Sequence, residues 1–107
     1  MDHINVFELK KLLDENADFQ LIDCRETHEY EYSHIPGAIN HPRFLIRRGE
    51  YGEMKKDKKI VLYCLSNINC PEIRDLMLAN GFKEVRCLEK GLADWIDEID
   101  PEMDFYL

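Results

Sequence analysis

The sequence predicts an α/β fold with a mostly parallel central sheet and helices on both faces. Short apolar segments with strand character alternate with amphipathic helical segments along the chain, as they do in folds of this class. The segment 58–64, KKIVLYC, carries an apolar run typical of a parallel strand that is buried on both faces. The 107 residues fit one domain, 1–107, without internal repeats or a linker.

A capped amphipathic helix is the first predicted element, over residues 5–16. Asn5 can cap this helix, and Glu8 follows three residues later, as in a capping box. Apolar residues of the segment recur with the helical period and form one stripe, which consists of Val6, Leu9, Leu12 and Leu13.

Shorter elements follow this helix. Residues 19–23, FQLID, have strand character, and residues 27–33, THEYEYS, predict a brief helix or helical turn. A Pro-Gly pair at 36–37 marks a turn, and residues 38–40 predict a short strand after it. The polar stretch 41–57 shows no clear pattern and yields no predicted element.

The last third of the chain has clearer boundaries. Residues 71–80, PEIRDLMLAN, predict a helix with Pro71 at its first position and Gly81 just past its end. Residues 84–88, EVRCL, predict a strand, and the apolar residues of 91–99, GLADWIDEI, follow the helical period.

Charge and composition restrict the class of partner. The formal net charge of −8 argues against nucleic acid or an anionic membrane, because both select basic surfaces. No apolar stretch approaches the roughly 20 residues that span a bilayer, and the N-terminus lacks a secretory pattern, so we expect a cytoplasmic protein. In that compartment the cysteines are expected to be reduced thiols, namely Cys24, Cys64, Cys70 and Cys87.

Cys64 has the most suggestive position among the four cysteines. Open parallel sheets bind ligands beyond the carboxyl ends of their strands, and Cys64 ends the clearest strand before an uncharged loop, 65–69. Free N–H groups and the dipole of a following helix stabilise anions and lower the pKa of a thiol. The sequence therefore predicts an activated thiol at Cys64. The alternative is a buried structural cysteine that acts as a small hydrophobe.

Three segments, in this order, resemble the single-domain rhodanese family of sulfurtransferases: LIDCRETHEYEYSHIPGAIN at 21–40, KDKKIVLYC at 56–64 and LMLANGFKEVRCLEKGLADW at 76–95. The resemblance covers roughly residues 3–97 and implies a rhodanese-like three-layer sandwich. It also implies that a cysteine accepts a sulfane sulfur as a persulfide and passes it to a nucleophile. No metal or organic cofactor takes part in that chemistry.

By position, the resemblance makes Cys64 the catalytic cysteine. The implied substrate-binding residues follow it, and they are Leu65, Ser66, Asn67, Ile68, Asn69 and Cys70. The first signature supplies the structural motif Asp23, Arg25, Glu29, His34 and Gly37. We favour an ion-pair cluster for the first three and a capping or packing role for the histidine. A related phosphatase branch uses a longer loop closed by arginine, so the loop excludes phosphatase activity.

The loop departs from the family pattern because it carries no charge. Basic residues are usual after the cysteine and at the loop's end, where this chain has Leu65 and Asn69. Arginine binds doubly charged oxyanions such as thiosulfate by charge-assisted hydrogen bonds. We therefore expect weak activity with thiosulfate, and a small-molecule or protein persulfide as donor with a thiol as acceptor. Cations elsewhere in the chain could still reach the loop, namely Arg43, Arg47, Arg48, Arg74 and Lys90.

Other functions remain open from the residues alone. A degenerate loop fits a binding or regulatory module, which an inert and buried Cys64 would favour. A thiol redox switch would join Cys64 and Cys70 in a disulfide, whereas in the simpler interpretation Cys70 only caps the following helix. A zinc site would need three or four converging thiolates.

Overall fold

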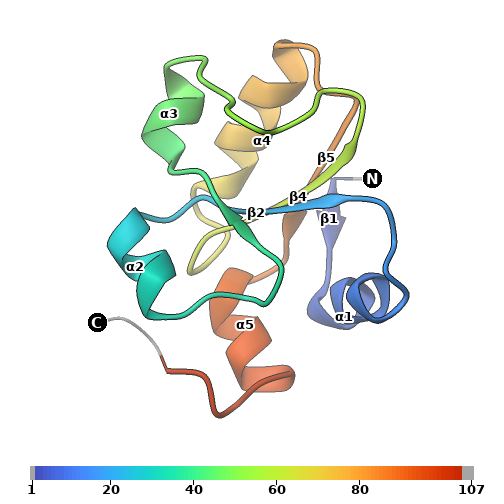
Figure 1. Ribbon diagram of the computed structural model, residues 1–107, viewed down its shortest axis with the longest axis vertical. Helices are drawn as coiled ribbons and strands as arrows, with labels where there is room; N and C mark the ends of the chain where they lie inside the picture. The colour runs from blue at the N-terminus through green and yellow to red at the C-terminus, as the bar shows by residue number, and fades with distance from the viewer. Residues whose placement is uncertain (1, 105–107) are drawn as a thin grey trace.

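A five-stranded parallel sheet in the order β1-β5-β4-β2-β3 forms the centre of the computed structural model, which describes residues 2–104 (Figure 1). The strands are β1 (His3–Ile4), β2 (Gln20–Asp23), β3 (Ile39–Asn40), β4 (Lys59–Tyr63) and β5 (Glu84–Leu88). In the described residues, neighbouring strands of the sheet pair in parallel. The carboxyl ends of the strands therefore lie at one edge of the sheet.

Helices cover both faces of this sheet. Within the described residues they are α1 (Val6–Asp14), α2 (Thr27–Tyr32), α3 (Arg43–Arg47), α4 (Cys70–Ala79) and α5 (Gly91–Glu98). In Figure 1, α3 and α4 lie above the sheet, and α1 and α5 lie below it. This arrangement confirms the predicted α/β fold, with a sheet that is wholly parallel. No helix among residues 2–104 is long and apolar enough to cross a membrane.

Strand β4 divides its side chains between two apolar clusters, one on each face of the sheet. Ile60 and Leu62 belong to the cluster on the α4 side, whereas Val61 and Tyr63 belong to the cluster with α1 and α5. All four are at most 3% exposed. Successive residues of a strand point to opposite faces, so burial of all four requires helices on both sides.

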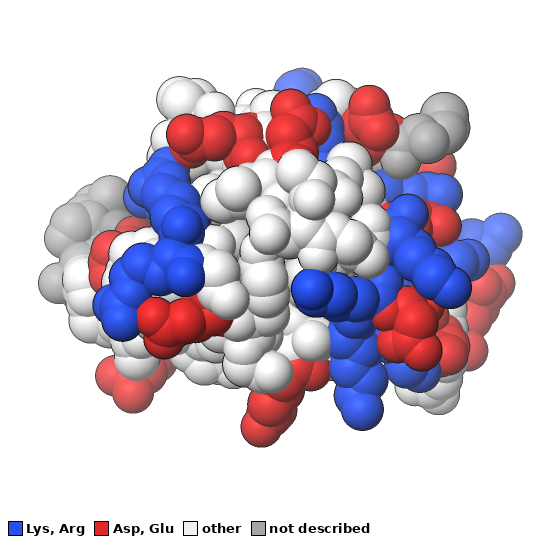
Figure 2. Space-filling view, turned by 90° about the horizontal axis from the view of Figure 1, so that it is seen from above, with Lys and Arg blue, Asp and Glu red and all other residues white. Residues whose placement is uncertain are grey.

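The charged surface mixes both signs on the face that carries α3 and α4. Seen from above, Lys and Arg side chains alternate with Asp and Glu side chains around an uncharged central area (Figure 2). This face carries no continuous basic surface of the kind that binds a nucleic acid backbone.

The predicted capping box of α1 is present in the structure, whereas Asn69, and not Cys70, occupies the N-cap of α4. The Glu8 N–H donates to Asn5 Oδ1 at 2.8 Å and the Asn5 N–H donates to Glu8 Oε1 at 3.0 Å, which is the predicted capping box. The helix predicted over 71–80 begins one residue earlier, at Cys70.

Two elements were not predicted. Strand β1 has only two residues, which is too short to show an apolar alternation. Helix α3 lies in the polar stretch 41–57 and buries a single residue, Ile46, so it carries no apolar stripe.

Candidate active site

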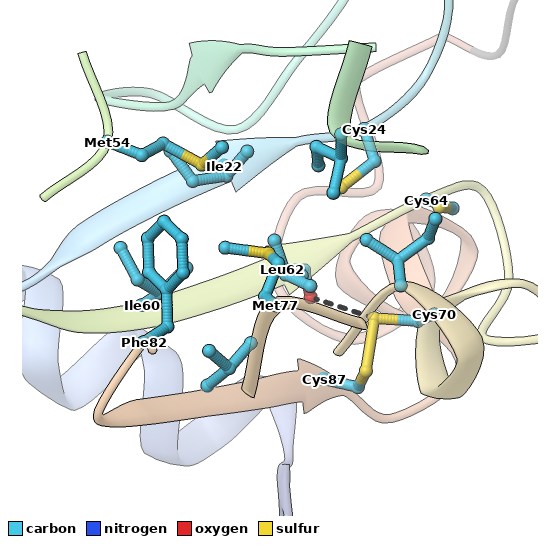
Figure 3. Close-up of a cluster of buried hydrophobic side chains, with 13 residues drawn as sticks. Ile22, Cys24, Met54, Ile60, Leu62, Cys64, Cys70, Met77, Phe82 and Cys87 are labelled. Carbon is cyan, nitrogen blue, oxygen red and sulfur yellow. Dashed lines mark hydrogen bonds between the residues drawn. A yellow bond between two sulfur atoms is a disulfide. The ribbon is translucent and has the colours of Figure 1, made fainter. Parts of the chain in front are cut away.

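Cys64 follows the last residue of β4 at the carboxyl edge of the sheet, where the site was predicted. The neighbouring strand β2 pairs with β4 in a register that places Asp23 beside Tyr63. A cysteine follows each of these two residues, Cys24 after Asp23 and Cys64 after Tyr63. The Cys24 N–H donates to the Tyr63 carbonyl at 2.9 Å. Cys24 is 1% and Cys64 4% exposed, and both lie in the cluster on the α4 side (Figure 3).

The surroundings of Cys64 lower the pKa of its thiol to about 7. The largest cause is a side-chain hydrogen bond from Cys24, burial acts in the opposite direction, and a hydrogen bond and the charge of Arg43 lower the pKa further. The pKa of Cys24 is raised well above its ordinary value, mainly by the same hydrogen bond and by burial. Cys24 therefore keeps its proton and acts as the donor, while Cys64 ionises near neutral pH.

Arg43 is the cation that reaches Cys64. Its Nη1 lies 3.7 Å from Cys64 Sγ. The Arg43 N–H donates to the Cys24 carbonyl at 3.1 Å, which fixes the start of α3 over the ends of β2 and β4. The other predicted cations have different positions: Arg47 pairs with Glu72, Arg48 with Glu50 and Arg74 with Asp75, and Lys90 occupies the N-cap of α5.

The loop 65–69 connects Cys64 to α4 and lies at the surface. Leu65 is 38% and Ile68 83% exposed. Within the described residues, the backbone N–H groups of 65–69 donate to no protein acceptor. These N–H groups are therefore available to an anion that enters the loop.

Helix α5 holds the beginning of this loop in place. The Leu92 N–H donates to the Cys64 carbonyl at 2.8 Å, and the Ala93 N–H donates to the Leu65 carbonyl at 2.9 Å. A Cβ at Gly91 would lie 2.5 Å from the Cys64 carbonyl oxygen, so only glycine permits this approach. Two N–H groups of the first turn of α5 thus fix the backbone on either side of the Cys64–Leu65 bond.

Asp23 and Arg25 form a buried ion pair at the end of β2. Arg25 Nη2 lies 2.8 Å from Asp23 Oδ2, and the two side chains are 3% and 0% exposed respectively. Arg25 also donates to the Ser33 carbonyl, and the Tyr63 hydroxyl accepts the Ile35 N–H at 3.1 Å. Burial, followed by the charge of Asp23, raises the pKa of Tyr63. This network ties the segment after α2 to the sheet.

The remaining signature residues lie around α2. The Glu29 carboxylate accepts the Glu26 N–H at 3.2 Å and so caps this helix. His34 Nδ1 lies 2.7 Å from the Tyr30 carbonyl, and the two rings stack at 3.8 Å between centroids. Gly37 occupies the following turn with φ +90°. None of these residues is hydrogen-bonded to Cys64 within the described part of the chain.

Cys70 and Cys87 form a disulfide, with their Cα atoms 5.9 Å apart. The expectation of four reduced thiols is therefore wrong for this pair. A switch between Cys64 and Cys70 is wrong as well, because the sulfur of Cys70 is bonded to β5. The spacing of Cys64 and Cys70 across one loop suggested a pairing, but Cys70 begins α4 and points into the core (Figure 3). Cys24 and Cys64 are free thiols.

Two further features lie apart from Cys64. In residues 2–104 the only group with three possible metal ligands is Asp94, Asp97 and Glu98, so the cysteines do not converge on a zinc site. A cleft of about 420 Å³ lies where β4 and β5 begin, lined by residues such as Phe19, Lys59 and Glu84.

Comparison with known proteins agrees with this architecture. The model of the rhodanese-like domain family matches residues 6–98, and the chain belongs to that family. A human single-domain sulfurtransferase superposes with a TM-score of 0.81 at 19% identity, covering 92% of this chain and 97% of that chain. At this identity the likeness establishes the shared fold.

Two curated relatives are larger proteins. A tRNA uridine(34) hydroxylase of Photorhabdus laumondii is 33% identical over 99 residues, which are 88% of this chain and 28% of that protein. MoeZ of Mycobacterium tuberculosis, a probable adenylyltransferase/sulfurtransferase, is 32% identical over 100 residues, which are 92% of this chain and 26% of that protein. The relatives of this domain thus include sulfurtransferases and tRNA uridine hydroxylases, and the chain spans little more than a quarter of these two.

Proposed function

We propose that the protein is a sulfurtransferase that carries a sulfane sulfur as a persulfide on Cys64. The main support for this proposal is the environment of the Cys64 thiol. Its pKa of about 7 makes a large fraction of this thiol ionised at neutral pH. Thiolates, and not thiols, attack sulfur. The free N–H groups of 65–69 and the Arg43 guanidinium supply donors for the negative charge that a persulfide brings.

The proposed reaction has two transfers at sulfur. The Cys64 thiolate attacks the sulfane sulfur of a donor RS–SH, a new S–S bond forms, and RS⁻ leaves with the electron pair of the old bond. An acceptor thiolate then attacks the outer sulfur, and Cys64 leaves as a thiolate. The protein is neither oxidised nor reduced over the cycle, and the sulfur atom keeps its oxidation level.

A thiol persulfide fits this site better than thiosulfate. Arg43 is the one cation that an ion pair or hydrogen bond brings to Cys64 within the described residues, and the loop itself is uncharged. Thiosulfate carries two charges, which a single guanidinium compensates only in part. The exposed Leu65 and Ile68 suit a protein or small-molecule donor with apolar groups. The net charge of −8 disfavours nucleic acid as partner.

A donor assay tests this function. The wild-type protein and Cys64→Ser are incubated with thiosulfate or with glutathione persulfide, and the intact mass is then measured. We expect the mass of one added sulfur on Cys64 of the wild type, with higher occupancy from the persulfide, and none on Cys64→Ser. An unmodified Cys64 after both donors would contradict the proposal.

The burial of Cys64 supports one competing function. At 4% exposure the thiol has little free surface, as expected for a rhodanese-like binding or regulatory module. Alkylation separates the two functions, because a module needs no reactive thiol. If Cys64 in the folded protein is alkylated at the rate of a free cysteine, the enzyme is favoured. If its alkylation is slower by orders of magnitude, the module is favoured.

A further inference from the structure

Cys24 has no part in the sulfur transfer described above, yet it lies directly across from Cys64. The two residues follow the last register pair of β2 and β4, Asp23 and Tyr63. Neighbouring strands lie about 4.8 Å apart, and residues in register point to the same face. Both side chains belong to the cluster on the α4 side, which confirms the shared face.

This separation matches the geometry of a disulfide. Disulfides join Cα atoms that are about 4.4–6.8 Å apart, so two cysteines that directly follow a register pair of adjacent strands need little backbone movement. The two thiols also influence each other's ionisation, because each is the first cause of the shift in the other's pKa. Cys70 and Cys87 are already bonded to one another and take no part in this pair (Figure 3).

We propose that Cys24 is a resolving thiol, which attacks Cys64 Sγ of the persulfide, releases the outer sulfur as hydrogen sulfide and leaves a Cys24–Cys64 disulfide. This inference rests on the proposed function, because it needs a persulfide on Cys64. It adds a second outcome to the reaction: without an acceptor, the domain reduces the carried sulfur to sulfide.

The step is balanced as Cys24–SH plus Cys64–S–S⁻ giving Cys24–S–S–Cys64 plus HS⁻. The bond between Cys64 Sγ and the outer sulfur breaks, and its electron pair leaves with the outer sulfur. The proton of Cys24 first passes to the outer sulfur, so that a Cys24 thiolate is the attacking group, HS⁻ is the leaving group and no external base is needed. The two cysteines are oxidised, the sulfane sulfur is reduced, and an external dithiol returns the protein to its starting state.

Arg43 favours the departure of sulfide from this position. Its Nη1 lies 3.7 Å from Cys64 Sγ, which is one of the two atoms of the bond that breaks. A fixed cation at this place stabilises the negative charge that grows on the leaving sulfur. Two neighbours of Cys64 thus serve this step: Cys24 provides the attacking sulfur, and Arg43 provides the cation that stabilises the leaving sulfide.

The experiment loads the full chain with glutathione persulfide, removes the donor, and follows sulfide and intact mass without an acceptor. We expect the wild type to release one sulfide per persulfide and to gain a Cys24–Cys64 disulfide. In Cys24→Ser, which retains a hydrogen-bond donor, the persulfide should last about tenfold longer or more, with rates normalised to the sulfur loaded. Trypsin leaves Cys64 and Cys70 on one peptide, so fragmentation between these two residues assigns the link.

Met77→Leu is the matched control, because it removes a sulfur atom from the same buried cluster and keeps the Cys24–Cys64 pair and the Cys70–Cys87 disulfide. It should release sulfide at the wild-type rate. Equal persulfide lifetimes in the wild type and Cys24→Ser, or transfer of the outer sulfur to Cys24, would overturn the resolving role alone. Absence of any persulfide in both proteins would overturn the proposed function and this inference together.

An oxidant provides an independent measurement of the pair. Diamide at equimolar amount should convert the free thiols of the wild type into the Cys24–Cys64 disulfide, without any persulfide. If this disulfide does not form in the folded protein, the geometry is wrong and the resolving role is excluded.

Discussion

Arg43 and Cys64 are in contact, with Nη1 3.7 Å from Sγ, although they are 21 positions apart in the chain. The family pattern puts basic residues within the loop after the cysteine, and this loop has none. Here the cation comes from the first residue of α3, on the other side of the thiol. The charge that the loop lacks is thus replaced in part by a residue from another element.

Replacing Arg43 should make Cys64 less acidic. Arg43→Gln removes a hydrogen bond and a positive charge that both lower the pKa of Cys64, so this pKa should rise above about 7. The rate of alkylation rises with pH as the thiol ionises. The midpoint of this rise should therefore lie at a higher pH in the variant than in the wild type. At neutral pH we expect alkylation about threefold slower or more.

Iodoacetamide alkylation of Cys64 over a pH series measures this effect. Arg47→Gln is the control, because Arg47 lies on the same helix and forms an exposed ion pair with Glu72. It should keep the wild-type midpoint. A common midpoint for Arg43→Gln and the wild type would show that the guanidinium does not act on the thiol.

The fold was readable from the sequence because its strands and longer helices have strong local patterns. The apolar run at 60–64 predicted burial on two faces, and Asn5 with Glu8 predicted the start of α1. Helix α3 was not readable, since it buries only Ile46 and is fixed by tertiary contacts such as that of the Arg43 N–H with Cys24. The partner of Cys64 was therefore hidden in a stretch without a pattern.

The pairing of the cysteines could not be predicted from the sequence either. The positions of Cys24 and Cys64 at strand ends were visible, but their pairing follows from a register between strands that are distant in sequence. The disulfide of Cys70 with Cys87 likewise joins the start of α4 to β5. Spacing along the chain suggested Cys64 with Cys70 because it reports proximity in sequence and not the direction of side chains.

Breaking the ion pair of Asp23 and Arg25 should be costly. Asp23→Asn leaves the Arg25 guanidinium, which is 3% exposed, without its carboxylate. An uncompensated buried charge costs about 3–5 kcal/mol, which is a large fraction of the stability of a small domain. Urea unfolding followed by circular dichroism measures this loss.

The exposed pair of Arg47 and Glu72 provides the comparison for that loss. Its side chains are 45% and 66% exposed, so Glu72→Gln should cost about 1 kcal/mol or less. If Asp23→Asn lost no more than Glu72→Gln, the buried pair would not support the fold.

Reduction of the Cys70–Cys87 disulfide should lower the stability. The two residues are 17 positions apart, and closing a loop of this length removes about 3 kcal/mol of chain entropy from the unfolded state. The urea midpoint of the wild type should therefore fall when a dithiol is added. The midpoint of Cys70→Ser/Cys87→Ser should not respond to the dithiol, and a similar response of both proteins would assign the effect to other thiols.

Gly91 should be irreplaceable because of its distance to the backbone of the site. In Gly91→Ala the new Cβ would lie 2.5 Å from the Cys64 carbonyl oxygen and 2.8 Å from that of Leu65. Backbone atoms cannot rotate away, so either the start of α5 or the end of β4 must shift. The shift should weaken the Leu92 hydrogen bond to Cys64 and change the reactivity of the thiol.

Gly49→Ala separates this clash from backbone strain. Both glycines have positive φ, +63° at Gly91 and +78° at Gly49, but at Gly49 a Cβ would meet nothing within 4 Å. The free energy of unfolding of each variant should fall by about 1–2 kcal/mol because of the backbone conformation. That of Gly91→Ala should fall by about 1–3 kcal/mol more because of the forced displacement. Urea unfolding and Cys64 alkylation of both variants test this. Equal losses, with unchanged alkylation in Gly91→Ala, would mean that the α5 contact does not position Cys64.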